Sequence, residues 1–308
     1  MKKFFPFLTA AAILLAASCS KSDDFEAEIP QPENEIWYTS SDSSVVMPAS
    51  LDKFNAKVIS NIYDFDKGVI LFNKGITSIA PWAFSGCSTL TSISIPKEVT
   101  NINDFAFYQC SSLADITISS KVDTIGSYSF YYCTSLKNIQ LPDSLTAIMV
   151  GAFYGCSSLE GINLPSSLKN IGGRSFYDCT SLKSIEIPGG VAHINQKAFC
   201  HCTSLENVKI NEGVKVFFEG AFNACTSLKS IELPSTMTSI QKSTFQGCTS
   251  LASIYCKAKA VPKLGENAFD NISLSAKIYV PMESVDAYKS ADDWSEYADK
   301  IVGYNFDE

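Results

Sequence analysis

Eight cysteines recur at intervals of 23 residues, and this fixed period constrains the fold more than any other feature of the chain. They are Cys87, Cys110, Cys133, Cys156, Cys179, Cys202, Cys225 and Cys248. Each stands in the phrase Phe-x-x-Cys-x-x-Leu-x-x-Ile/Val, and the phenylalanines keep the same spacing from Phe84 to Phe245. A period in the twenties indicates one short unit copied many times, in which each copy buries its apolar side chains against its neighbours. The pattern therefore predicts a solenoid.

Each unit is expected to begin with a short strand and then to turn. Leu90, Ile93 and Ile95 lie at the spacing of a half-buried strand, and equivalent residues recur in the later units. Proline follows in most copies, as at Pro96 and Pro142, and ends the strand because it has no N–H to donate. We expect the strands of successive units to stack in parallel, about 4.8 Å apart, joined by turns and short helical returns.

The strand phrase Leu-x-x-Ile-x-Leu-Pro and the return phrase Ala-Phe-x-x-Cys-Thr-Ser-Leu resemble the leucine-rich repeats of BspA-like bacterial cell-surface proteins. The resemblance covers residues 75–257. It implies a leucine-rich repeat solenoid with a 23-residue period, mainly of short parallel strands and capped at both ends. BspA-like proteins are associated with adhesion to host matrix or cell-surface proteins. The resemblance therefore implies a non-enzymatic protein that binds protein partners.

The recurring cysteines are interpreted as part of the core. Equivalent side chains of stacked coils point the same way at about 4.8 Å, which exceeds the usual Cβ separation of a disulfide, about 3.5 to 4.5 Å. Cysteine behaves as a small apolar residue that is often fully buried. Zinc needs paired ligand spacing, and Cys200 with Cys202 is the one close pair. We predict a column of buried free thiols, and whether Cys200 is reactive stays open.

The first part of the chain carries export features. Residues 1–18 contain two lysines and a long apolar run, typical of a signal peptide. The stretch that ends in Ser18 and Cys19 resembles a bacterial lipobox, which implies a lipoprotein with a lipid on Cys19, anchored in the outer membrane and facing outward. Residues 19–34 are polar and acidic and are predicted to be a linker.

The repeats are expected to be closed by a cap at each end. Residues 35–74 alternate apolar and polar, with Asp66-Lys67-Gly68 as a turn between two strands, and predict an N-terminal β cap. Residues 258–308 are predicted to hold a degenerate repeat and a helical cap. In that cap, an amphipathic helix over 282–302 follows a last strand at 278–281 and buries Val285, Tyr288, Trp294, Tyr297 and Ile301.

Charge and motif content exclude several classes of function. The net charge is −8, and the solenoid residues balance 12 acidic against 12 basic side chains, so there is no basic track for nucleic acid. No nucleotide-binding loop, serine-hydrolase elbow or zinc-protease motif is present. His193 and His201 occupy variable positions in the repeat and are interpreted as solvated turn residues. We therefore expect no enzyme, no metal and no cofactor.

A tyrosine stripe is the sharpest candidate for a binding site. Tyr108, Tyr131, Tyr154 and Tyr177 directly follow the phenylalanine in four consecutive units. Stacked rings offer a large contact area with a polar tip, which suits a protein or a surface glycan. Two alternatives remain open here. The rings can instead seal the core, and the polar outward face of the strands is a second candidate surface.

Three functions are compatible with these features. The leading prediction is a surface-exposed lipoprotein that binds protein partners, with the membrane reached only through the lipid anchor. The second is a glycan-binding accessory lipoprotein of a nutrient-uptake system, using the same tyrosines. The third is a spacer in the surface layer that binds nothing.

Overall fold

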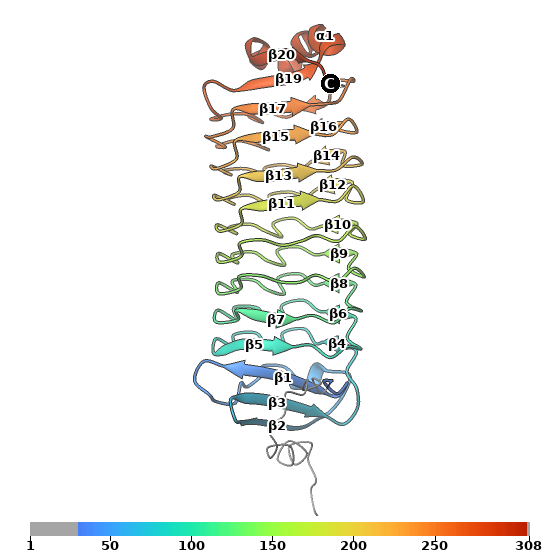
Figure 1. Cartoon of the computed structure of the whole chain (residues 1–308), viewed down its shortest axis with the longest axis vertical. Helices are drawn as coiled ribbons and strands as arrows, with labels where there is room; N and C mark the ends of the chain where they lie inside the picture. Colours follow the sequence, from blue (N-terminus) through green and yellow to red (C-terminus); the bar gives the residue numbers. More distant parts are fainter. Residues whose placement is uncertain (1–29, 307–308) are drawn as a thin grey trace, which may run out of the picture. The chain divides into compact units, whose positions relative to one another are not determined.

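The computed structural model describes residues 30–306. Its compact unit begins at Gln31, and the coils of this unit lie one upon the next (Figure 1). The expected signal peptide and Cys19 lie outside the described residues. Within the unit the predicted solenoid of short parallel strands is confirmed, with neighbouring coils pairing in register at the 23-residue period.

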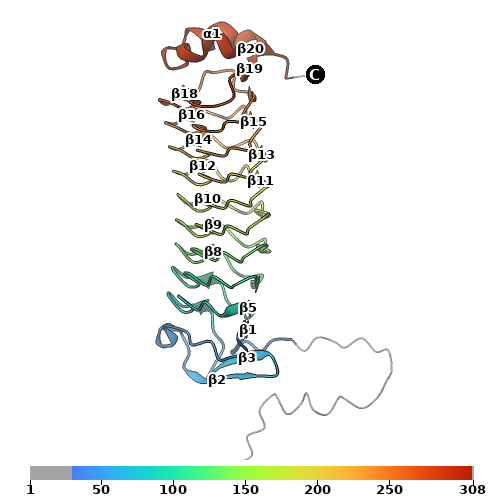
Figure 2. The ribbon, with the colours of Figure 1, turned by 90° about the vertical axis from the view of Figure 1, so that its left-hand side faces the viewer.

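Most coils contribute two strands. The two strands lie on opposite sides of the stack (Figure 2). The first strand contains the isoleucine or valine that follows the repeat leucine by three residues, or its counterpart in the last coil. These strands are β5(Leu90–Ser94), β7(Asp115–Thr117), β11(Ser184–Ile187), β13(Asn207–Ile210), β15(Ser230–Leu233), β17(Ser253–Cys256) and β19(Lys277–Pro281). The second strand is only two residues long and forms one nine-stranded sheet from β4(Ser78–Ile79), β6(Asn101–Ile102), β8(Thr124–Ile125), β9(Ala147–Ile148), β10(Asn170–Ile171), β12(His193–Ile194), β14(Val216–Phe217), β16(Ser239–Ile240) and β18(Lys263–Leu264).

The first-strand ladder is less continuous than the second. It is assigned as β5-β7, then β11-β13, then β15-β17-β19. Residues 138–141 and 161–164, which occupy the same place in the two intervening coils, are not in regular strands. The break between β7 and β11 therefore spans two coils.

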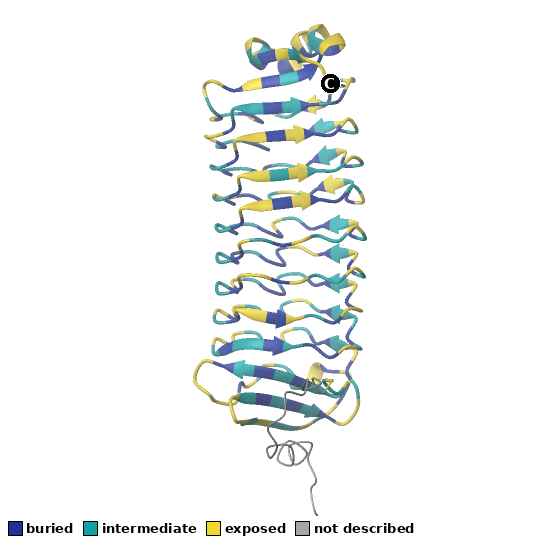
Figure 3. Ribbon diagram, viewed as in Figure 1, coloured by how far each residue is buried: buried dark blue, intermediate teal, exposed yellow. Residues whose placement is uncertain are grey.

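The interior between the two sheets is apolar and closely packed. The phenylalanine rings from Phe84 to Phe269 form one stack, with neighbouring centroids 5.1–5.6 Å apart and planes within 1–10° of parallel. The leucine and isoleucine columns are buried beside them, whereas the flanking strand residues face solvent (Figure 3). Because every buried column continues into the next coil, the coils share one core.

The thiols line this core as predicted. All ten described cysteines are free and buried. From Cys110 to Cys248, each thiol of the column donates to the backbone carbonyl of the phenylalanine in the preceding coil, at 2.9–3.2 Å. Cysteine therefore does more than fill space, because its S–H is a second donor to a core carbonyl that already accepts a backbone N–H within its own turn.

The returns between the sheets differ from the expected short helices. They are tight turns, and the described chain contains no helix between Lys53 and Met282. Each return includes two residues with left-handed φ, such as Phe105 at 59° and Gln109 at 56°, and this conformation recurs coil after coil. A left-handed residue cannot continue a right-handed helix, so the chain turns back toward the next strand.

The N-terminal end is closed by three strands, β1(Glu35–Ser40), β2(Val58–Asp64) and β3(Lys67–Phe72), and a short 3₁₀ helix, η3(Leu51–Lys53). Strand β1 pairs antiparallel with both β3 and β5, so the cap continues the first sheet of the solenoid. The turn was placed wrongly at residues 66–68. It is the pair Phe65 and Asp66, both left-handed, which gives a two-residue hairpin and places Lys67 opposite Asp64.

The C-terminal end is not the single helix that the pattern predicted. It consists of η4(Met282–Ser284), α1(Val285–Ser290), η5(Asp292–Lys300) and a final strand, β20(Ile301–Tyr304), which pairs in parallel with β19. Tyr288, Trp294 and Tyr297 are buried as expected. The indole of Trp294 donates to the carbonyl of Pro262 at 2.8 Å. The chain leaves the helical conformation at Ile301 and pairs as β20 with β19. The backbone of β20 thereby covers the open edge of β19.

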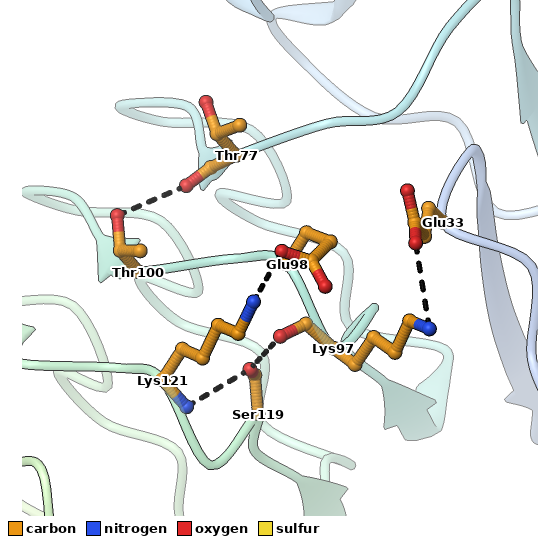
Figure 4. Close-up of polar contacts among 7 residues, drawn as sticks. All are labelled: Glu33, Thr77, Lys97, Glu98, Thr100, Ser119 and Lys121. Carbon is orange, nitrogen blue, oxygen red and sulfur yellow. Dashed lines mark hydrogen bonds and ion pairs between the residues drawn. The ribbon is translucent and has the colours of Figure 1, made fainter.

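Polar contacts also join neighbouring coils along the outside of the stack. Near the N-terminal end, Lys121 forms an ion pair with Glu98, and Lys97 lies 3.4 Å from Glu33 (Figure 4). The hydroxyl of Ser119 donates to the carbonyl of Lys97 at 2.6 Å. These pairs are exposed, so each contributes little by itself.

Candidate binding surface

The four predicted tyrosines form a stack along one edge of the coils. Tyr108 and Tyr131 lie nearly parallel at 4.7 Å, Tyr131 and Tyr154 are 5.0 Å apart and tilted by 34°, and Tyr154 and Tyr177 lie at 4.6 Å. The stack continues to the imidazole of His201, 5.2 Å from Tyr177. The turn after each phenylalanine therefore places these rings one above the next.

A second, shorter column of rings lies beside the first. Trp82, Phe105 and Tyr128 are also 23 residues apart and share a left-handed turn position. Trp82 stacks on Phe105 at 4.0 Å, and Phe105 stacks on Tyr128 at 5.3 Å. This column meets the first through contacts such as Phe105 with Tyr108 at 5.8 Å. Sequence reasoning missed Trp82 and Phe105 because the residue type changes along the column, although the spacing was visible.

Together these side chains form a continuous surface, which we call the aromatic edge. It comprises Trp82, Phe105, Tyr108, Tyr128, Tyr131, Tyr132, Tyr154, Tyr177 and His201. Trp82 and Tyr132 are 39% and 38% exposed, and the four tyrosines of the stripe are half-buried. The rings are thus neither sealed inside the core nor held free in solvent.

The phenol groups of the stripe are available as hydrogen-bond donors. Within residues 30–306, the hydroxyls of Tyr108, Tyr131 and Tyr154 have no hydrogen-bond partner. Burial, followed by the neighbouring phenol and carboxylate groups, raises the pKa of Tyr154 to about 12, and burial also raises the pKa of Tyr131. The phenols of Tyr131 and Tyr154 therefore stay protonated at neutral pH and present O–H groups at the rim of an apolar surface.

The far end of the aromatic edge holds the cysteine and histidine that could have suggested a nucleophile. Cys200 is 2% exposed, and burial raises the pKa of its thiol to about 11. The imidazole of His201 instead faces Asp178, with Nδ1 3.2 Å from Oδ1. A buried, protonated thiol is inert, and Cys200 is therefore not a reactive group.

The outward face of the first strands is the second candidate surface. It is polar, and it is hollowed beside the break in the strand ladder, where Asn138, Gln140 and Asn163 lie around Gly161. Toward the C-terminal end of this face, Tyr255 stacks on Tyr279 at 4.6 Å, and Tyr304 meets both rings edge to face. The repeated phrase Ile-Tyr at 254–255 and 278–279 could have indicated this pair.

Neither surface is a metal centre in the part of the chain that the structure describes. Among residues 30–306, no three His, Cys, Asp or Glu side chains gather in a way that could hold a metal ion. Within the same residues, every helix is too short or too polar to span a membrane.

The fold and these surfaces define a leucine-rich repeat protein of the parallel solenoid type. A family model described as the BspA type leucine-rich repeat region, present in six copies, matches residues 68–183 and 169–290. The chain therefore belongs to the BspA-type leucine-rich repeat family, as its repeat phrases predicted. Repeat proteins of this kind are typically non-enzymatic and commonly serve as scaffolds for protein interaction.

Solved structures of bacterial leucine-rich repeat proteins resemble the chain. One from T. pallidum is 33% identical over 51% of this chain and 73% of its own, with a TM-score of 0.48. One from Bacteroides ovatus is 24% identical over 80% of this chain and 90% of its own, with a TM-score of 0.35. One from Eubacterium ventriosum is 21% identical over 66% and 82%, with a TM-score of 0.46. A comparison with curated proteins gave no match.

Proposed function

We propose that this protein binds protein partners at the bacterial surface through the aromatic edge. The observation that carries the proposal is the size and exposure of this edge: rings from consecutive coils form one half-exposed surface with free phenol donors. Tyrosine and tryptophan are enriched where proteins bind one another, because they bury a large area at low cost in side-chain entropy. Because four consecutive coils carry tyrosine at the same position, the edge presents similar contacts at regular intervals along a partner.

The partner is proposed to be a host matrix protein or another cell-surface protein, in keeping with the BspA-type family. The charge of the repeats is balanced, so the interaction would not rest on long-range electrostatic attraction. The alternative ligand for the same rings is a surface glycan, since sugar rings also stack on aromatic side chains. Binding assays on protein and glycan panels separate these two.

Replacing Tyr108, Tyr131, Tyr154 and Tyr177 together by serine tests the site. We expect saturable binding of the wild-type protein to at least one member of a panel of purified extracellular-matrix proteins, measured by biolayer interferometry. The serine variant should bind at least about tenfold more weakly, because it removes the central aromatic anchors. A variant with phenylalanine at the same four positions keeps the rings. It should lose only the part of the binding affinity that the hydroxyls contribute.

A matched control is available on the strand face, where Tyr255 and Tyr279 form a similar stacked pair. Serine at these two positions should leave the affinity within about twofold of wild type. Circular dichroism must show that both variants keep the β-solenoid. Absence of saturable binding by the wild-type protein, or equal affinity in the serine variant of the stripe, would contradict the proposal.

We also propose that the protein is a lipoprotein of the outer membrane, anchored through Cys19. The support is the lipobox-like stretch before this residue, which lies outside the described part of the chain. Cys19→Ser should move the protein from the membrane fraction to the soluble fraction of cells, because the thioether to the lipid cannot form. Wild-type protein in the soluble fraction, or unchanged sedimentation of the variant with membranes, would argue against the anchor.

A further inference from the structure

One hollow lies on the outward face of the first strands, at the break between β7 and β11. Its volume is about 440 Å³, and its walls come from four consecutive coils. The polar side chains around it are Asn138, Gln140, Asn163, Ser184 and Asn207, and the buried isoleucines beneath them form the floor. We call this hollow the amide groove.

The groove exists because one coil lacks a side chain at the outward position. Gly161 stands where the neighbouring coils carry Asn138 and Ser184, and a Cβ placed on it would meet nothing within 4 Å. The residue is thus not required by crowding. Its effect is to open a recess between the amide side chains on either side.

The amide groups around the recess are free to bind. Elsewhere on the stack, Asn103 and Asn195 each donate to a carbonyl of the preceding coil, at 2.8 and 2.7 Å. In contrast, the side chains of Asn138, Gln140 and Asn163 make no hydrogen bond with any of residues 30–306. Each amide offers both an acceptor oxygen and two donor hydrogens to a ligand.

The groove carries no net charge. Its charged side chains are Glu186 and Lys209, which pair with each other at 2.8 Å, and Glu186 also accepts from Asn211 at 3.0 Å. No uncompensated charge is left to attract a phosphate, a carboxylate or a cation. The isoleucines of the floor, Ile139, Ile162 and Ile185, are only 4–6% exposed and offer no slot for an apolar anchor.

From these observations we propose that the amide groove binds a neutral oligosaccharide. Sugar hydroxyls both donate and accept hydrogen bonds, as amides do, and need no opposite charge. A peptide would instead draw most of its affinity from buried aromatic or aliphatic anchors, which this groove does not accommodate. The site lies on the strand face and is separate from the aromatic edge and its protein partners.

The face beyond the groove supplies a platform for a longer ligand. Tyr255 and Tyr279 occupy the outward position of later coils, and Tyr255 lies four repeats beyond Asn163. At about 4.8 Å per coil this is about 19 Å, which an extended oligosaccharide can span and a monosaccharide cannot. Affinity should therefore rise with chain length, as sugar rings reach the stacked tyrosines.

The proposal is tested with a substitution that fills the recess with a side chain and leaves the fold intact. Gly161→Leu places an apolar side chain in open space. Ser239→Leu is the control, because it makes the same kind of change on β16, on the opposite side of the stack from the groove and from Tyr255 (Figure 2). An array of neutral glucan, mannan and xylan oligosaccharides identifies the ligand, and calorimetry gives its dissociation constant. We expect at least tenfold weaker binding for Gly161→Leu and a change below twofold for Ser239→Leu.

A double variant, Gln140→Ala with Asn163→Ala, removes the amides while leaving the recess open, and should also bind at least tenfold more weakly. It keeps the test decisive if Gly161→Leu does not fold. The serine variant of the tyrosine stripe should retain full oligosaccharide binding, which separates this site from the aromatic edge. No binding to any neutral oligosaccharide, binding only to peptide arrays, or unchanged affinity in the amide double variant would overturn the proposal.

Discussion

At the scale of single residues, the repeat depends on side chains that bond to the backbone or fit its turns. The thiol of Cys156 occupies the core and donates to the carbonyl of Phe130 in the preceding coil. The left-handed turn positions hold glycine in some coils and larger residues in others. One such position is Tyr128 in one coil and Gly151 in the next. Sequence spacing predicted the buried thiols, because their periodicity fixed their direction. The hydrogen bonds that they make depend on the coil geometry and could not be read from the spacing.

Gly151 gives a residue-scale test of this geometry. Its φ is +62°, and a Cβ on it would lie 2.4 Å from Cε1 of Tyr128. We expect Gly151→Ala to lower the free energy of unfolding by about 1–3 kcal/mol, because the turn is strained and the ring must move. Gly161→Ala is the matched control, with open space around the new methyl group, and should stay within about 0.5 kcal/mol of wild type.

Urea unfolding monitored by circular dichroism measures both variants, and the midpoints can be compared if the slopes agree. A Gly151→Ala protein as stable as wild type would show that the turn has room to adapt. An equal loss in both glycine variants would show that the two sites are not distinguished by local crowding.

At the scale of elements, the sequence predicted the elements whose pattern extends over several residues. It missed those that are very short or that depend on tertiary pairing. In β11 and β15, the first strand of the coil alternates exposed and buried residues over its four positions. The second strand has two residues, too few for any alternation, so its nine-stranded sheet emerges only when the coils are stacked. The C-terminal apolar spacing correctly indicated which rings are buried, but tertiary pairing of β20 with β19 replaced the end of the expected helix.

The candidate surfaces were predictable to different degrees. The tyrosine stripe follows from identical residues at one repeat position, and its rings do stack. The amide groove could not be foreseen, because it depends on a missing side chain at Gly161 and on amides that the surrounding coils leave unpaired. Such a site is a property of several coils together.

At the scale of the described unit, stability is expected to come from contacts between adjacent coils. Stacked rings, thiol-to-carbonyl bonds and parallel ladders all join a coil to its immediate neighbours, and the two caps cover the ends of the core. The first-strand sheets end at strand β20 on the C-terminal side and, beyond β1 and β3, at strand β2 on the N-terminal side. The candidate binding surfaces then lie on the outside of a framework whose interior is apolar and repeats from coil to coil.

The central claim is that unpaired thiols line this shared interior, and alkylation measures it most directly. Burial raises the pKa of core thiols such as Cys133 and Cys179, which keeps them protonated as well as inaccessible. With iodoacetamide at pH 8 and no reductant, peptide mass spectrometry should find the ten cysteines from Cys87 to Cys256 unmodified in the folded protein and all ten alkylated after denaturation. Disulfide-linked peptides from the denatured protein, or rapid alkylation of the folded one, would contradict the account.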